Sequence, residues 1–172
     1  MSTVRYAPLA GLALAVGLGS AIASPAHADS AAAQTAKVSI AQAVEAAEKA
    51  GMGKATEADF EDDQGGRWEV KVLADGGNKL TKYFIDPNTA EVKGQEEQTF
   101  EKYFVMLKPE NFQKAQVQLK DAIAAAEALA KGKATSAEVE REGEAVAYEI
   151  EVATTEGDRD VKVDAMGKAT PD

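Results

Sequence analysis

Carboxylates are the only reactive side chains that this chain carries in number. Its 172 residues include 29 acidic and 19 basic residues, a single histidine and no cysteine. The histidine, His27, lies in an N-terminal segment that we expect to be removed, so the remaining chain has neither an imidazole nor a thiolate. Ser-His and Cys-His catalysis are therefore excluded within one subunit, as are zinc, copper and iron sites built on nitrogen or sulfur ligands.

Some of the acidic residues form two short groups whose oxygen atoms could hold a calcium ion. These groups are Glu61-Asp62-Asp63 and the alternating Glu138, Glu140 and Glu142. The ligand order of an EF-hand is absent, and acidic residues in a turn usually face water. We therefore assign no catalytic, cofactor-binding or metal-ligating residue, expect no cofactor and no enzyme activity, and leave the partner-binding residues open. An acidic protein that binds calcium without a protein partner is the alternative function.

The first 28 residues are typical of a secretion signal. Arg5 gives a positive start, residues 9–22 are apolar, and Ala26-His27-Ala28 is a small-x-small cleavage site. We predict a signal peptide at 1–28 with cleavage after Ala28, hence a periplasmic or secreted protein; an uncleaved anchor is the alternative. Loss of Arg5 leaves 18 basic and 29 acidic residues, a net charge of −11 (18 − 29). This charge repels nucleic acid and anionic membranes, so we expect no nucleic-acid partner, and after cleavage no stable membrane insertion.

Behind this segment the chain repeats itself. Residues 38–48 match 117–127 in their apolar spacing, and an identical Gly-Lys-Ala-Thr follows at 53–56 and at 132–135, an offset of 79 positions (132 − 53). Trp68-Glu-Val-Lys-Val matches Tyr148-Glu-Ile-Glu-Val at an offset of 80 (148 − 68), and Ile85-Asp86 matches Val163-Asp164 at an offset of 78 (163 − 85). Matches in this order indicate a duplication, with small insertions or deletions in the turns.

The sequence of each copy predicts one helix followed by strands. Ser39 and Gln42 form a capping box, an apolar stripe at helical spacing follows, and glycines end the helix. The residues after it alternate between apolar and polar, interrupted by turns rich in glycine and aspartate. We therefore predict an α+β protein of two small tandem modules, at 37–94 and 115–172, each with one helix packed on a three- to four-stranded antiparallel sheet.

Two segments lie outside the copies. Residues 29–36 are small and polar without periodicity, which predicts a flexible leader. Residues 95–114 form an aromatic connector, in which Tyr103 to Leu107 fits either a helix or a strand and Pro109 would end a helix. The connector either packs the two modules together or offers an aromatic docking surface to a partner.

The order of elements resembles the PepSY module of exported bacterial proteins and of thermolysin-like metallopeptidase propeptides. The residues that carry the likeness are the helices that begin at Ile40 and Leu119, the strands that begin at Trp68 and Tyr148, and the hairpins at Ile85-Asp86 and Val163-Asp164. The second hairpin lacks a Thr-Gly-Glu-like turn and the chain ends soon after it, so its last strand is expected to be short.

This resemblance implies a non-catalytic module that inhibits or chaperones a peptidase, or regulates activity at the cell envelope. The expected partner is a peptidase or another envelope protein, and an exposed strand edge is the surface that such a sheet offers to an extended segment. Exposed positions differ between the copies: Lys71 aligns with Glu151, Lys79 with Arg159, and Lys82 has no clear counterpart. Such differences, or the connector, are where function is expected.

Overall fold

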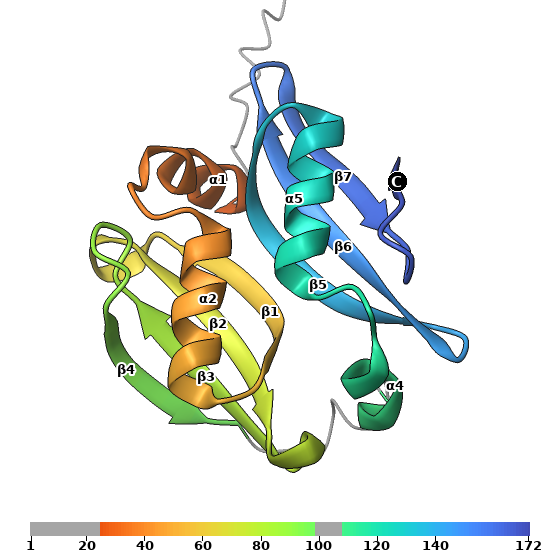
Figure 1. Cartoon of the computed structure of the whole chain (residues 1–172). Helices are drawn as coiled ribbons and strands as arrows, with labels where there is room; N and C mark the ends of the chain where they lie inside the picture. Colours follow the sequence, from red (N-terminus) through yellow and green to blue (C-terminus); the bar gives the residue numbers. More distant parts are fainter. Residues whose placement is uncertain (1–24, 99–107) are drawn as a thin grey trace, which may run out of the picture.

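The computed structural model describes residues 25–98 and 108–172 (Figure 1). The first copy consists of α1 (Pro25–Thr35), α2 (Ile40–Gly51), β1 (Lys54–Glu61), β2 (Arg67–Ala74), β3 (Lys79–Ile85) and β4 (Val92–Glu97). The second consists of α4 (Pro109–Lys114), α5 (Leu119–Ala130), β5 (Lys133–Glu142), β6 (Ala145–Thr154), β7 (Gly157–Val163) and β8 (Ala169–Pro171). Short 3-10 turns lie at Asp63–Gly65 and Asp75–Gly77. Each copy is thus a helix on a four-stranded antiparallel sheet, as predicted.

The two small sheets join into one sheet of eight strands, in the order β4-β3-β2-β1-β5-β6-β7-β8. The join is an antiparallel pairing of β1 with β5 over three positions, centred on Ala58 opposite Ala137. These two alanines are equivalent in the repeat, because 137 − 58 gives the same offset of 79. The copies therefore meet about a pseudo-two-fold axis, like the two subunits of a symmetric dimer.

Helices α2 and α5 lie side by side on one face of this sheet and bury the core against it (Figure 1). Each helix buries the stripe predicted from its spacing, with Ile40 and Val44 in α2 and Leu119 and Ile123 in α5. The capping box of Ser39 and Gln42 is present, and Gln118 with Asp121 forms its counterpart. Among the described helices, none is long and apolar enough to cross a membrane.

The identical Gly-Lys-Ala-Thr turns have a steric cause. A Cβ atom on Gly53 would lie 2.4 Å from the carbonyl oxygen of Leu73, and one on Gly132 would lie 2.2 Å from that of Ala153. No real side chain tolerates such an approach to a rigid strand, so the chain can enter β1 and β5 at this point only as glycine. The glycine of the repeated turn is therefore a requirement of the fold.

Hydrogen bonds within each module are also duplicated. Trp68 Nε1 donates to the carbonyl oxygen of Val38 at 3.0 Å, and the hydroxyl of Tyr148 donates to that of Val117. Burial raises the pKa of Tyr148 to about 12, so the hydroxyl stays a donor at any physiological pH. Trp68 and Tyr148 thus fasten each sheet to the residue just before its main helix.

The segment predicted as a flexible leader is instead helical in the structure. Residues 29–35 belong to α1, which contacts β1 in its own copy and β5 and β6 in the other. Ala33 and Ser30 are buried there, although the sequence around them has no amphipathic period. Contacts with the second copy, rather than local periodicity, account for the helix.

The connector differs from expectation at both of its ends. Strand β4 continues to Glu97, beyond the predicted module boundary at residue 94, and Pro109 begins α4 rather than ending a helix. The choice between helix and strand for Tyr103 to Leu107 lies outside the described residues. Strand β8 is short, as the sequence predicts, at three residues.

Candidate functional site: the open face and the outer edges of the sheet

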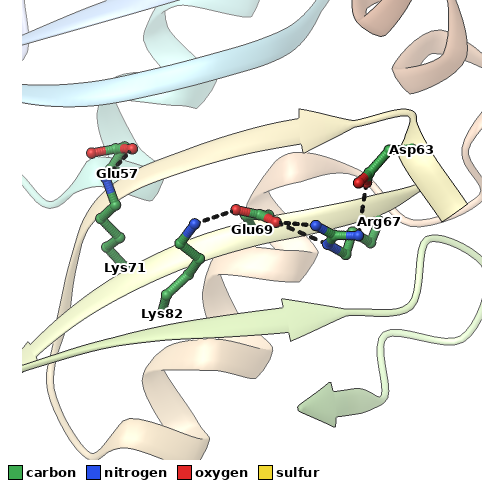
Figure 2. Close-up of polar contacts among 6 residues, drawn as sticks. All are labelled: Glu57, Asp63, Arg67, Glu69, Lys71 and Lys82. Atoms are coloured by element: carbon green, nitrogen blue, oxygen red, sulfur yellow. Dashed lines mark hydrogen bonds and ion pairs between the residues drawn. The ribbon is translucent and has the colours of Figure 1, made fainter. Parts of the chain in front are cut away.

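The sheet face opposite α2 and α5 carries charged side chains, and in the first copy they form ion pairs (Figure 2). Glu69 accepts hydrogen bonds from Lys82 and Arg67, each at 2.6 Å, and Lys71 pairs with Glu57 at 2.5 Å. Burial alone would raise the pKa of Glu69, but the hydrogen bonds from Lys82 and Arg67 hold that pKa below its usual value. On the open face of the first copy, Arg67, Lys71 and Lys82 are therefore each paired with a carboxylate.

The second copy lacks these cations. The ladder places Lys71 opposite Lys82 and Glu151 opposite Asp160, so Glu151 and Asp160 occupy the equivalent positions. In this register the counterpart of Lys82 is Asp160, which the sequence alignment did not identify. In the first copy Lys79 pairs with Ala74, and in the second Gly157 pairs with Thr154, which is equivalent to Ala74. Lys79 therefore corresponds to Gly157 and not to Arg159.

Three carboxylates lie directly opposite one another in the middle of the open face. Glu57 of β1 faces Glu138 of β5, which faces Glu149 of β6. Partial burial and the charge of Glu57 raise the pKa of Glu138, and partial burial and Glu140 raise that of Glu149. Like charges placed opposite each other in a sheet destabilise it, and the pair Glu138 and Glu149 does so in the second copy, although Lys162 of β7 lies opposite Glu149 on its other side.

Asp59 lies at one end of the seam, beside helix α1. Ser136 donates to its Oδ1 at 2.6 Å, and Ser30 of α1 donates to Glu151 at 2.7 Å. All four residues line a cavity of about 230 Å³. Burial raises the pKa of Asp59 to about 7, and the charge of Glu57 adds to this, while the bond from Ser136 opposes it. Asp59 therefore titrates close to neutral pH.

The two acidic groups singled out from the sequence do not come together. Asp63 pairs with Arg67 at 2.7 Å, and Glu142 lies 3.3 Å from Lys162. Across residues 25–98 and 108–172, the structure brings no three carboxylates into an arrangement that could ligate a metal ion. The described residues thus offer no observation in favour of the calcium alternative.

The pairing of the copies leaves two outer edges, at β4 and β8. Strand β4 has six residues and pairs with β3 alone among the described residues, whereas β8 has three. Beside β4 a shallow groove of about 670 Å³ separates the strand from α2. Its floor is apolar, with Ala46, Ala50, Ala90 and the half-exposed Val92. The sequence suggested edge binding without indicating which strand remains free.

Comparison with known proteins identifies both copies. The sequence profile of the PepSY family, described as the peptidase propeptide and YPEB domain, matches residues 37–96 and 116–167. A crystal structure from Clostridium difficile 630, of a protein described as a lipoprotein candidate, is similar at 18% sequence identity and a TM-score of 0.48. The similarity covers 84% of this chain and 99% of that one. No curated protein matches the chain.

Proposed function

The chain belongs to the PepSY family of peptidase propeptide and YPEB domains, and from that membership we propose that it is an exported, non-catalytic protein that binds and modulates a peptidase in the cell envelope. The observation that carries the proposal is the match of both copies to a family named for peptidase propeptides. A propeptide acts by contact with its peptidase, so the chain needs a binding surface and no catalytic group of its own.

The organisation of the sheet supports a role in binding. Each copy uses one sheet edge to pair with the other copy and keeps the opposite edge at the outside of the molecule. A free edge presents backbone N–H and C=O groups to an extended polypeptide, which is the conformation in which peptidases and their inhibitors meet many of their ligands. The absence of histidine after residue 27 and of cysteine throughout supports a mechanism without covalent or zinc chemistry.

The proposed location is the periplasm or the exterior of the cell, after cleavage behind Ala28. The apolar residues 9–22 and the small residues at 26 and 28 support this location. The mature chain would begin at Asp29 and retain Ser30, Ala33 and Gln34, the residues of α1 that contact the two copies.

The test uses the chain from Asp29 onward as bait for the envelope fraction and culture supernatant of the organism that makes it. We expect a peptidase among the recovered proteins, and at least a twofold change in azocasein hydrolysis when the purified chain is added to the same fractions. Unchanged hydrolysis together with no specifically recovered protein would contradict the proposed function. A bait that begins at Ala36 and therefore lacks α1 serves as the control for retention through misfolded surfaces.

A further inference from the structure

We infer that the outer edge of β4 receives the partner, as an extended segment that adds to the sheet antiparallel and carries basic side chains, whereas the edge at β8 is closed. This inference rests on the proposed function and adds the site, conformation and charge of the partner. It follows from three observations: the hydrogen-bond phase of β4, the residue at the equivalent place in β8, and the charge on the open face of β4.

The phase of the β3–β4 ladder shows which backbone groups of β4 point outward. Gln98 donates its N–H to the carbonyl oxygen of Leu80 at 2.9 Å, which makes Leu80 and Gln98 a hydrogen-bonded pair. Such pairs alternate with non-hydrogen-bonded ones along an antiparallel ladder. Gln95, opposite Tyr83, and Glu97, opposite Thr81, therefore turn their N–H and C=O groups away from β3. These groups are placed to bond an added strand.

The equivalent position in the second copy is a proline. Asp172 donates its N–H to Asp160 at 3.1 Å, so Pro171, opposite Val161, occupies a non-hydrogen-bonded position of β8. Val161 corresponds to Tyr83 at the offset of 78 (161 − 83), and Pro171 therefore corresponds to Gln95. Proline has no N–H to offer, and a proline on an outer strand prevents edge-to-edge pairing.

The surroundings of β4 favour a partner with basic side chains. On its open face β4 carries Glu96, and Lys82 opposite it is already paired with Glu69 at 2.6 Å. Glu96 thus adds to the acidity of the whole molecule, which attracts cations. The apolar floor of the groove accepts small aliphatic side chains on the helix side of the strand.

In such a partner strand, the residues that form hydrogen bonds with β4 all point toward the same face of the sheet. Gln95 lies on the helix side of the sheet, because Tyr83 opposite it is buried under α2. In an antiparallel pair, directly opposite residues share a face, so the partner residues that bond Gln95 and Glu97 also point toward the groove. The aliphatic residues of the partner thus carry the bonding amides, and its basic residues project over the open face near Glu96.

The probe is an acetylated seven-residue peptide in which lysine and valine alternate, labelled with fluorescein and titrated with the mature chain. We expect saturable binding by fluorescence anisotropy. Methylation of the valine amides should weaken it at least tenfold, while methylation of the lysine amides, which leaves charge and composition identical, should leave it within twofold. A peptide with glutamate in place of lysine should not bind.

The matched protein variant is Gln95→Pro, which places the proline of β8 at the equivalent position of β4. The ladder with β3 uses no N–H of Gln95, so the fold should persist while affinity falls at least tenfold. If the variant fails to fold, the methylated peptides decide the question on the unchanged protein. No binding of the lysine-valine peptide, or equal binding of both methylated forms, overturns the inference. A peptidase recovered in the pull-down would leave the proposed function standing in either case.

Discussion

At the scale of single residues, Asp59 is the group whose protonation the fold controls most strongly. An unfolded chain ionises this carboxyl near 3.8, whereas the folded chain does so near its raised pKa of about 7. The contribution of Asp59 to stability is therefore complete below pH 3.8 and is lost as the pH rises to about 7. Ionisation near the seam thus weakens the molecule at neutral pH.

The variant Asp59→Asn removes this dependence and keeps an oxygen that accepts the bond from Ser136. We expect its free energy of unfolding to exceed that of the unchanged protein above pH 7, by on the order of 1–3 kcal/mol after allowance for partial exposure. Urea unfolding at intervals from pH 4 to pH 8 measures the difference, which should grow steadily across this interval. A difference that does not change with pH would assign the raised pKa of Asp59 no role in stability.

The paired donors Trp68 and Tyr148 provide a second test at this scale. Tyr148→Phe removes only the hydroxyl and leaves the carbonyl oxygen of Val117 without its buried donor, at a cost of about 1–3 kcal/mol. Trp68→Phe removes the donor to Val38 and also leaves a cavity, so it should cost more. Denaturation followed by circular dichroism measures both, and the double variant should show the sum because the two sites lie in different copies.

At the scale of elements, helices α1 and α4 each bridge the two copies. Lys54 of β1 donates to the carbonyl oxygen of Gln113 at 2.9 Å, and Lys133 of β5 donates to that of Gln34 at 3.0 Å. Both lysines and both glutamines are related by the offset of 79 (133 − 54 and 113 − 34). Each copy is therefore contacted both by its own short helix and by the short helix that precedes the main helix of the other.

The contacts of α1 with β5 and β6 predict that loss of α1 destabilises the second copy, far away in the sequence. A chain that begins at Ala36 lacks Ser30 and Gln34, the partners of Glu151 and Lys133. We expect amide hydrogen exchange to accelerate at least tenfold in β5 and β6, relative to the chain that begins at Asp29. If the faster exchange is confined to β1, the contacts of α1 with the second copy contribute nothing to its stability.

Elements with strong local signals can be predicted from the sequence, whereas elements that depend on contacts at long range cannot. The capping boxes, the apolar stripes and the alternation around Trp68 placed the main helices and the central strands. Helix α1 was missed because its alanines have no period and its partners lie about 100 residues away. The edge of β4 was missed for a similar reason, since the outward phase of Gln95 depends on a register that no local pattern encodes.

At the scale of the whole molecule, the duplication acts as a dimer within one chain. The copies contribute the same surface, so Glu57 faces Glu138 and Asp59 faces Ser136 on either side of the alanine pair. The repeat was visible in the sequence, but the seam was not, because two alanines in a strand carry no sign of their partner. Because the copies pair through their inner edges, β4 and β8 become the outer edges of the sheet, and among the described residues β4 pairs with β3 alone. The copies differ there, since Gln95 of β4 corresponds to Pro171 of β8.

The continuous sheet predicts that the two copies unfold together. Trp68, the single tryptophan, reports on the first copy by fluorescence, whereas far-ultraviolet circular dichroism reports on both. In the unchanged protein the two urea transitions should coincide. In Ala137→Leu they should separate, because Ala58 and Ala137 are fully buried beneath α2 and α5 and extra volume costs about 1–3 kcal/mol there. The first copy should then keep its own transition, and coincident curves in the variant would mean that the copies are coupled through α1 and α4 rather than through the seam.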